Sequence, residues 1–247
     1  MTSYLITGAS RGLGLAMVQA LVSQPANQVT KIFAAYRTKT DGITELSSSH
    51  NGRVVPVRMD VTSPDEIRAA VTEVERALEG QPLDVLINNA GAAPTTPGGI
   101  VEMNDLTATL DLNLVGVQRV TQSFMPLLEK SAVKKIVNIS STMGCFAYQE
   151  YLAQVKTPAY KVSKAALNML TLLWAQEYGP KGYVIAGLSP GYVKTDLSGD
   201  AADLEVSEAI PAIMKAIEGM SPDDNGRLLD IKLPGWEPRY LGGPQPW

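Results

Sequence analysis

The octapeptide TPAYKVSK places a tyrosine four residues before a lysine. Thr157 and Pro158 suit the N-cap and the first position of a helix. The spacing then predicts a helix with Tyr160 and Lys164 on one face, while Lys161 points about a quarter-turn away. Such a pair belongs either to a solvated helix surface or to a site in which an ammonium lowers the pKa of a phenol. In the second case the phenol is a proton-transfer group for chemistry near neutral pH.

The chain contains one histidine and one cysteine. His50 lies in the polar run SSSHNG, which predicts an exposed loop, and we interpret Cys145 as a packing residue. A Ser-His-Asp triad, a Cys-His site and a histidine-based metal site are therefore not expected. Any chemistry must come from hydroxyls, carboxylates, amides, lysines or a cofactor. Because one cysteine cannot form an internal disulfide, we expect a reducing compartment, the cytoplasm.

The composition is typical of a globular protein, since 45% of the 247 residues are hydrophobic. The net charge of -4 gives no reason to expect nucleic acid or an anionic membrane as a partner. No apolar stretch reaches the length of a membrane span, and no signal peptide is expected before the strand-like SYLIT at residues 3–7.

Apolar β-type runs alternate with helical patterns along the chain. This alternation predicts a doubly wound, mostly parallel α/β sheet of about seven strands with helices on both faces, in a single domain over residues 1–247. Ser63 and Glu66 predict a capping box, and a Pro/Gly-rich tail begins at Pro234. Strands are expected at 3–7, 31–36, 53–57, 83–88, 134–140, 183–189 and 227–233, and helices at 12–23, 63–80, 157–178 and 206–219, with a long helical region ending near 130.

The segment TGASRGLG joins the first expected strand to the first expected helix. Glycines at positions 8, 12 and 14 allow a tight turn and a close approach of the backbone to a ligand. The N-terminus of the helix can then face a pyrophosphate. Such a turn can also be turn chemistry alone, but its place between strand and helix favours a dinucleotide site.

Further polar segments follow the other expected strands: YRT, MDV, NNAG, ISS and SPGYVKT. In an open α/β sheet the carboxyl ends of parallel strands form the edge at which ligands bind. Each segment alone could be a loop with suitable turn residues. Together they predict a binding site at this edge.

The motifs TGASRGLG, Asp60, NNAG, Asn113 in DLNLVG, NISS, YKVSK and PGYVKT stand in one order and at characteristic spacings. In this pattern, which spans residues 3 to about 196, the chain resembles the short-chain dehydrogenase/reductase family. AAYRT and the C-terminal PW are most similar to carbonyl reductases of the C-factor/sniffer-like group. The resemblance implies a Rossmann fold and an oxidoreductase with a nicotinamide cofactor.

The resemblance also implies which residues bind the cofactor. They are Gly8, Ser10, Arg11, Leu13 and Gly14 for the phosphates, Asp60 and Val61 for the adenine, Asn89, Ala90 and Gly91 for the ribose region, and Pro190, Gly191, Val193 and Thr195 for the nicotinamide.

The implied catalytic set is Asn113, Ser141, Tyr160 and Lys164. In the reduction of a ketone Tyr160 would donate the proton, while Lys164 and the oxidised cofactor would favour its phenolate. Ser141 would hydrogen-bond the carbonyl oxygen, and Asn113 would hold a proton-relay water. Lys164 would also bind the ribose hydroxyls, and the resemblance places Tyr160 with it among the cofactor-binding residues. Of the two serines in NISS we assign Ser140 to packing, and the long separation of Ser141 from Tyr160 predicts an enlarged loop between them.

The end of the second expected strand indicates which cofactor is used. A carboxylate there hydrogen-bonds the adenosine ribose and repels a 2′-phosphate. The strand instead ends in AAYRT, with Tyr36 in the place of the acid, Arg37 next and no acid before Asp41. Arg11 in the glycine-rich turn can approach the same phosphate. We therefore predict NADP(H), with Arg37 as a contact; the alternative is two exposed arginines near a loop.

Large apolar side chains gather at 142–159 and 192–206, where they either cap the core or line a pocket for a bulky, mostly apolar ketone or aldehyde. We predict an NADPH-dependent carbonyl reductase with a small-molecule substrate, as a homodimer or a monomer rather than a tetramer. The alternatives are a non-redox acid/base enzyme on the same scaffold and a cofactor-binding sensor with little turnover. The apolar side chains are Met143, Phe146, Tyr148, Tyr151, Leu152, Tyr192 and Leu197.

Overall fold

The computed structural model describes every residue from Met1 to Trp247, and the chain forms two compact units. The first unit comprises Met1–Ala90 and Gly116–Val137, and the second comprises Gly91–Val115 and Asn138–Trp247. The expected single domain over residues 1–247 stays a prediction.

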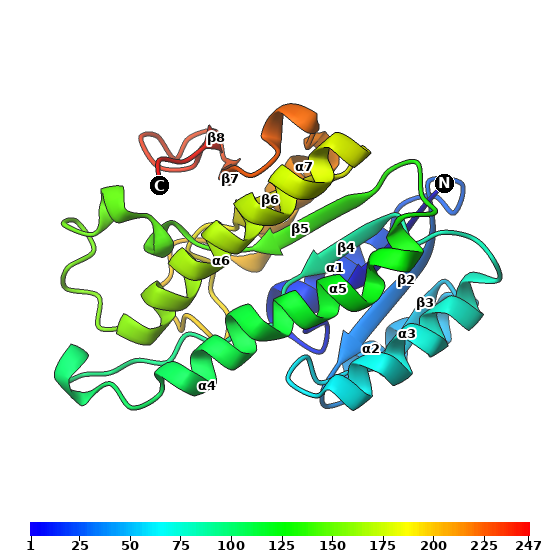
Figure 1. Cartoon of the computed structure of the whole chain (residues 1–247), viewed down its shortest axis with the longest axis horizontal. Helices are drawn as coiled ribbons and strands as arrows, with labels where there is room; N and C mark the ends of the chain where they lie inside the picture. Colours follow the sequence, from blue (N-terminus) through cyan, green and yellow to red (C-terminus); the bar gives the residue numbers. More distant parts are fainter. The chain divides into compact units, whose positions relative to one another are not determined.

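The first unit contains four parallel strands in the order β3-β2-β1-β4. Strand β4 is an unbroken apolar run that ends in an asparagine, and all of it is buried, as is usual for a parallel strand covered on both faces. Helices α3 and α5 pack side by side (Figure 1). The elements of this unit are β1 (Thr2–Ile6), α1 (Gly12–Val22), β2 (Val29–Tyr36), α2 (Asp41–Ser49), β3 (Val54–Arg58), α3 (Pro64–Leu78), β4 (Val85–Asn88) and α5 (Gly116–Leu128).

In the second unit β6 and β7 pair in parallel, and β8 pairs with β7 in the antiparallel direction. The longest helix, α6, packs along β6, which is buried throughout (Figure 1). The elements are α4 (Leu106–Leu110), a π-helical turn (Asp111–Val115), α6 (Pro158–Tyr178), β6 (Val184–Ser189), α7 (Val206–Gly219), β7 (Leu228–Lys232) and β8 (Leu241–Pro244).

Strand β5 (Lys135–Ile139) has residues in both units, and the complete sheet has the order β3-β2-β1-β4-β5-β6-β7-β8. The predicted doubly wound α/β fold with a mostly parallel sheet is confirmed. The sheet has eight strands rather than about seven, because β8 lies in the predicted tail. Gly242 and Gly243 in β8 have φ angles of +77° and +78°, and the strand is mostly exposed, so no apolar alternation marks it in the sequence.

Two other local predictions hold only in part. The long helical region expected before residue 130 is formed by α4, the π-helical turn and α5, which follow one another from Leu106 to Leu128. The residues before it are a loop with a 3-10 turn at Ile100–Glu102, because the run PTTPGG blocks a helix. In the run SSSHNG the three serines end α2 at Ser49, and His50, Asn51 and Gly52 form the turn after it. His50 is half-buried there, with its Nδ1 2.9 Å from the carbonyl oxygen of Leu46.

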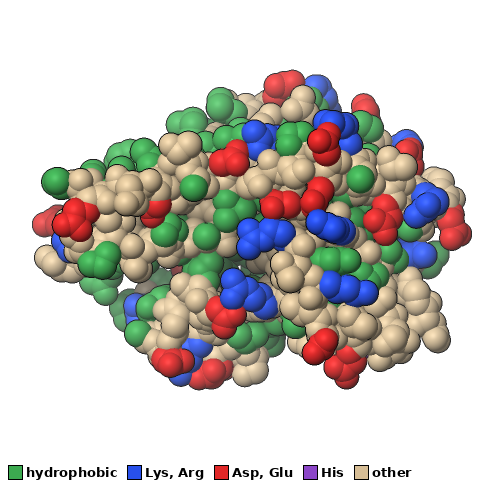
Figure 2. All heavy atoms as spheres, turned by 90° about the horizontal axis from the view of Figure 1, so that it is seen from below, with side chains coloured by type: hydrophobic (Ala, Val, Ile, Leu, Met, Phe, Trp, Pro, Cys, Tyr) green, Lys and Arg blue, Asp and Glu red, His purple; other side chains and the backbone are tan.

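On the face drawn in Figure 2, acidic and basic side chains are interspersed, and hydrophobic side chains lie between them. None of the helices combines the length and the apolar character that a membrane span requires. No group of three or more His, Cys, Asp or Glu side chains is placed to hold a metal ion.

Candidate active site

The glycine-rich turn between β1 and α1 is too narrow for larger side chains. Gly8 and Gly12 have φ angles of +66° and +54°, which favour glycine. A Cβ on Gly14 would press on the carbonyl oxygen of Gly8, and a Cβ on Gly8 would lie 2.8 Å from the Cα of Ala90. The turn therefore exposes backbone where other residues would place side chains.

The N-terminus of α1 opens onto this turn. Arg11 occupies the N-cap position, no side chain caps the helix, and its first turn contains no acidic residue. The first N–H groups of a helix have no partner within the helix, and they bind phosphate oxygens well. Of the other residues predicted to bind the phosphates, Ser10 lies in the turn and Leu13 in the first turn of α1. The turn fits the pyrophosphate of a dinucleotide.

Asn89 and Ala90 support the glycine-rich turn from the end of β4. The amide of Asn89 donates to the carbonyl oxygens of Thr7 and Gly8, at 2.9 Å and 3.3 Å. The hydroxyl of Thr7 accepts the backbone N–H groups of Asn89 and Ala90, at 2.9 Å and 3.0 Å. The amide nitrogen of Asn89 thus donates two hydrogen bonds to the glycine-rich turn, and its side chain stabilises the turn.

The segment after β2 lies beside the same turn. The N–H of Ala9 donates to the carbonyl oxygen of Ala35 at 2.9 Å, and the hydroxyl of Thr40 donates to that of Ser10 at 2.8 Å. Arg37, between these two contacts, is exposed. The predicted contact to a 2′-phosphate and the predicted pyrophosphate site therefore belong to one surface of the first unit.

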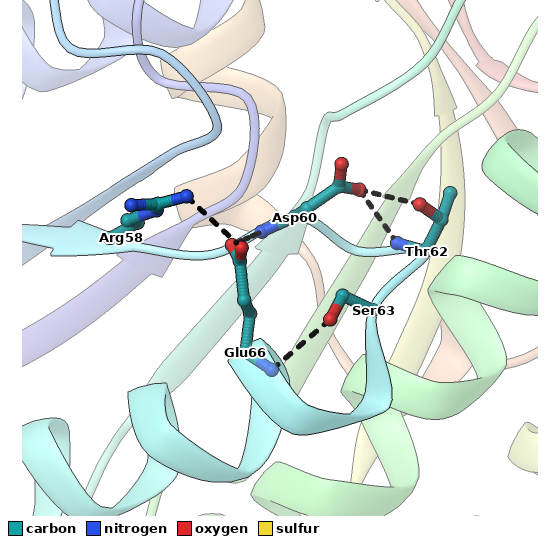
Figure 3. A network of polar contacts seen from close by, with 5 residues as sticks. All are labelled: Arg58, Asp60, Thr62, Ser63 and Glu66. Atoms are coloured by element: carbon teal, nitrogen blue, oxygen red, sulfur yellow. Dashed lines mark hydrogen bonds and ion pairs between the residues drawn. The ribbon is translucent and has the colours of Figure 1, made fainter.

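Asp60 follows β3 within a network of polar contacts (Figure 3). Its Oδ1 accepts the backbone N–H of Thr62 at 2.9 Å and the hydroxyl of Thr62 at 2.7 Å. Burial by itself raises the pKa of Asp60, but the two bonds from Thr62 and the charge of Arg37 outweigh it, and the pKa lies below its usual value. Asp60 is therefore a carboxylate at neutral pH, with Arg37 close enough to act on it. Val61, the other residue predicted for the adenine, is buried.

The carboxylate of Glu66 does not bind the backbone N–H of Ser63, as the predicted capping box requires, but contacts other groups (Figure 3). The hydroxyl of Ser63 accepts the N–H of Glu66 at 3.3 Å, which is the first half of a capping box. The carboxylate of Glu66 accepts the N–H of Asp60 at 2.9 Å and pairs with Arg58 at 3.3 Å. The second half of the capping box is wrong, because the N–H of Ser63 already donates to the carbonyl oxygen of Asp60. Glu66 instead fixes the turn that carries Asp60.

The second unit contains all four residues of the predicted catalytic set. One of them, Ser141, follows the end of β5 directly after Ser140. The hydroxyl of Ser140 donates to Asn168, and both residues are buried. The hydroxyl of Ser141 accepts the N–H of Met143 at 3.1 Å and forms a hydrogen bond with Tyr160. Ser140 thus packs against α6, and Ser141 is the serine that meets the tyrosine.

Tyr160 and Lys164 lie on consecutive turns at the start of α6. The Nζ of Lys164 lies 5.5 Å from the centroid of the Tyr160 ring and donates to the carbonyl oxygen of Ile139 at 2.7 Å. Lys164 is 5% exposed, which excludes a solvated helix surface for it. Thr157 is at the N-cap position, but its hydroxyl contacts the sulfur of Met143 at 3.9 Å instead of capping the helix.

Burial shifts the pKa values of this pair in opposite directions. Desolvation raises the pKa of Tyr160 to about 12, against the lowering effect of the hydrogen bond with Ser141. Desolvation lowers the pKa of Lys164 to about 8. The lowering of the phenol pKa that is expected from the ammonium together with the oxidised cofactor stays a prediction. At neutral pH Tyr160 holds its proton, and most of Lys164 is charged.

Asn113 is buried in the π-helical turn after α4. Its Oδ1 accepts the N–H of Ala92 at 2.9 Å, and its Nδ2 donates to the carbonyl oxygen of Ala92 at 2.8 Å and to the hydroxyl of Ser163 at 3.0 Å. π-helical turns are rare and frequently occur at functional sites. The side chain of Asn113 therefore ties the π-helical turn to Ala92 and to Ser163.

Ser163 connects two members of the predicted catalytic set, although it is not among the residues predicted for the site. It is fully buried, it accepts the bond from Asn113, and its hydroxyl donates to the carbonyl oxygen of Tyr160 at 2.8 Å. The one feature of the sequence that could have indicated its role is its position between Tyr160 and Lys164, directly before the lysine.

Replacing Ser163 with alanine should lower the free energy of unfolding by about 1–3 kcal/mol, because a buried amide hydrogen and a carbonyl oxygen each lose a partner. We expect kcat to fall by less than about tenfold, since Asn113 keeps both bonds to Ala92. Ser49→Ala is the control: the exposed Ser49 donates to Glu45, and its loss should cost about 0.5 kcal/mol or less. Equal denaturation midpoints for the two variants would contradict the bridging role.

Gly144 lets the turn after Ser141 approach α6. A Cβ at this position would lie 2.5 Å from the carbonyl carbon of Lys164 and 2.6 Å from the nitrogen of Ala165. Any larger residue would push Ser141 and Lys164 apart. Nothing in the sequence marks this glycine, because its partner is 20 residues away along the chain.

The segment predicted to surround the nicotinamide follows β6. Gly191 has a φ angle of +84°, and Val193 is buried. The N–H and the hydroxyl of Thr195 are 3.2 Å and 3.1 Å from the hydroxyl of Ser198, which therefore fixes Thr195. Pro190 precedes this turn and is partly exposed.

The enlarged loop exposes apolar side chains. Phe146 and Tyr151 are 81% and 82% exposed, so they do not cap the core. Tyr192 and Leu197, from the second apolar segment, are also exposed. Cys145 in the same loop is buried, and burial raises the pKa of its thiol to about 11, which leaves it unreactive at neutral pH.

Comparisons with known proteins agree with these features. The family model for short chain dehydrogenases matches residues 3–205. The C-signal protein of Myxococcus xanthus is 34% identical over 167 residues, which cover 67% of this chain and 93% of that protein. The NADPH-bound carbonyl reductase from chicken fatty liver has a TM-score of 0.89 with 32% identity, covering 100% of this chain and 94% of that chain. Carbonyl reductase Sniffer of D. melanogaster has a TM-score of 0.88 with 29% identity, covering 100% of both chains. The chain therefore belongs to the short-chain dehydrogenase family of oxidoreductases.

Proposed function

We propose that this oxidoreductase uses NADPH to reduce the carbonyl group of a bulky, mostly apolar ketone or aldehyde. The observation that carries the proposal is the cluster in the second unit: a protonated phenol, Tyr160, is hydrogen-bonded to Ser141 and lies beside the buried ammonium of Lys164. The structural similarity to a carbonyl reductase that binds NADPH supports the choice of reaction and cofactor.

In this proposal the first unit holds most of the cofactor, which supplies the hydride when bound. The glycine-rich turn and the N-terminus of α1 bind the pyrophosphate, as their narrow shape and open N–H groups allow. Arg37 binds the 2′-phosphate, and Asp60 meets the adenosine. Gly91 and the segment from Pro190 to Thr195 complete the ribose and nicotinamide contacts.

Tyr160 is the proton donor. Its pKa of about 12 keeps the proton on the phenol until negative charge develops on the carbonyl oxygen of the substrate. Ser141 hydrogen-bonds that oxygen and holds it close to the phenol. The positive charge of Lys164 then stabilises the phenolate that remains, in a site where burial strengthens the interaction. Lys164 also binds the ribose hydroxyls, and Asn113 holds a proton-relay water.

The exposed apolar side chains indicate the substrate. Phe146, Tyr151 and Leu197 have no place in the core, and an apolar substrate would remove part of their surface from water. We therefore propose a small-molecule substrate with large apolar substituents on the carbonyl carbon.

The purified protein should oxidise NADPH in the presence of bulky aromatic or alicyclic ketones and aldehydes, as measured by the loss of the absorbance of reduced nicotinamide. A matched alcohol product should appear in equal amount. Binding of NADPH without turnover of any carbonyl compound in a broad panel would indicate a cofactor-binding sensor. Conversion of a substrate without a change in the nicotinamide would indicate a non-redox acid/base enzyme.

We also propose that the protein acts in the cytoplasm as one domain, and that it is a homodimer or a monomer. Sedimentation equilibrium tests the last point, since a stable tetramer would contradict it.

A further inference from the structure

The C-terminal segment, residues 233–247, turns back on itself and pairs with β7 through β8. The N–H of Leu233 donates to the carbonyl oxygen of Tyr240 at 2.9 Å, which closes the turn between β7 and β8. The N–H of Gln245 donates to the carbonyl oxygen of Leu228 at 2.7 Å. The segment is therefore a fixed part of the second unit, from which its side chains can hold other loops.

Tyr240 binds one such loop. Its hydroxyl donates to Oδ2 of Asp203 at 2.8 Å and accepts the backbone N–H of Tyr192 at 3.1 Å. Arg239 pairs with the same oxygen of Asp203 at 2.7 Å. The side of the ring faces Gly191, where a Cβ would lie 3.2 Å from Cε1 of Tyr240. Tyr240 is only 9% exposed and its two hydrogen bonds are partly buried, whereas the Arg239 side chain is half exposed.

The loop from Tyr192 to Leu204 is also closed by its own backbone. The N–H groups of Asp203 and Leu204 both donate to the carbonyl oxygen of Tyr192 at 3.0 Å, and the N–H of Lys194 donates to that of Leu204 at 2.8 Å. Tyr192 is thus bound to the far end of the loop through its carbonyl and to Tyr240 through its N–H. Tyr240 therefore fixes the base of the loop that carries the exposed Tyr192 and Leu197.

A second side chain of the C-terminal segment binds the enlarged loop after β5. The hydroxyl of Tyr148 donates to Oε1 of Gln245 at 2.8 Å. Tyr148 lies between Phe146 and Tyr151, the two aromatic residues that are more than 80% exposed. One segment therefore contacts both of the loops that present apolar side chains.

We infer that Tyr240 and Gln245 are positioning residues that set the specificity for bulky substrates, because they hold the two apolar loops in one arrangement. This inference rests on the proposed function. Neither residue touches the reacting atoms. Their effect reaches the substrate through Tyr192 and Leu197 on one loop and through Phe146 and Tyr151 on the other.

The first test is Tyr240→Phe, which removes the hydroxyl and keeps the ring against Gly191. We expect KM for a bulky ketone to rise about tenfold, because two partly buried hydrogen bonds that hold the loop are lost. KM for a small aldehyde should stay nearly constant, since a small aldehyde reaches few of the apolar side chains. Asp203→Asn keeps an oxygen that can accept from Tyr240 but loses the charge opposite Arg239, and it should give an intermediate KM.

Tyr178→Phe is the matched control. Tyr178 lies at the C-terminal end of α6 with its ring against Trp174 and Tyr183, and its loss of a hydroxyl should change neither KM. An equal rise of KM for the bulky and the small substrate in Tyr240→Phe, or no rise for either, would overturn the assignment of specificity to Tyr240.

The second anchor is tested with Tyr148→Phe and Gln245→Leu. Each should raise KM for the bulky ketone, and the double variant should do no more than either single variant, because both remove the same hydrogen bond. Additive effects would show that the two residues act separately and would contradict the anchor.

Amide hydrogen exchange keeps the inference testable if no carbonyl compound is reduced. In Tyr240→Phe the amides of residues 192–204 should exchange faster, and in Tyr148→Phe those of residues 146–152. Unchanged exchange in both variants would refute the positioning role by itself. Faster exchange in a protein without turnover would leave that role intact and refute the proposed function instead.

Discussion

Replacing Tyr160 with phenylalanine should lower kcat for carbonyl reduction by roughly 10²–10⁴-fold, the usual effect of losing a positioned acid. The variant loses only the phenol hydroxyl, which is the group assigned as the proton donor. Ser141 remains, but a serine hydroxyl does not readily give up a proton near neutral pH. The ring keeps its place beside the Nζ of Lys164, so the fold and the affinity for NADPH should change little.

The measurement compares single-turnover rates at saturating NADPH with the dissociation constant from cofactor fluorescence. Tyr178→Phe serves as the control for a lost phenol hydroxyl on the same helix. If Tyr160→Phe retains more than about a tenth of the wild-type kcat, Tyr160 is not the acid. If it also fails to bind NADPH, the loss of activity cannot be assigned to proton transfer.

Replacing Arg37 with aspartate should reverse the preference between the two nicotinamide cofactors. In the wild type a charge-assisted hydrogen bond to the 2′-phosphate contributes about 1.5–3 kcal/mol, which corresponds to a roughly ten- to hundredfold preference for NADPH. Arg37 is exposed, and its charge also acts on the carboxylate of Asp60. Solvent exposure and the neighbouring carboxylate both weaken the attraction between Arg37 and a phosphate. We therefore expect a preference in the lower half of that range. Aspartate would remove the attraction and repel the phosphate.

The ratio of kcat/KM for NADPH and NADH measures the preference in both proteins. Arg68→Asp makes the same change of charge on the exposed face of α3, where Arg68 pairs with Asp65, and it should leave the ratio nearly unchanged. Equal kcat/KM values for the two cofactors in the wild type would contradict the choice of NADPH while leaving the catalytic set untouched.

Features that depend on residues close together in the sequence could be predicted from it. Helical periodicity placed Tyr160 and Lys164 on one face of α6, and the contact of 5.5 Å between them agrees. Continuous apolar runs indicated strands buried on both faces, and β4 and β6 are of this kind. The glycine spacing indicated a narrow strand-to-helix turn, because a positive φ at Gly8 is a local demand of the backbone.

One strand and the contacts at one helix N-terminus could not be predicted from the sequence, because they depend on hydrogen bonds of the main chain. β8 is held by hydrogen bonds between main-chain groups, for which its glycines and prolines give no side-chain signal. Glu66 was expected to return to Ser63, but the turn at Asp60 lies within reach and offers it another donor. In both cases the partner was chosen by the path of the backbone rather than by residue type.

The sequence by itself determined which residue types stand in the candidate site, because motif spacing and helical periodicity are properties of the chain order. Only the tertiary structure decided their chemical state. Tyr160 has a pKa of about 12 and Lys164 a pKa of about 8, in each case because surrounding segments remove water from the group. Asn113 is held by Ala92 and by Ser163, which is 50 residues further along the chain. Desolvation and such long-range hydrogen bonds arise only when distant segments pack together, so no local pattern encodes them.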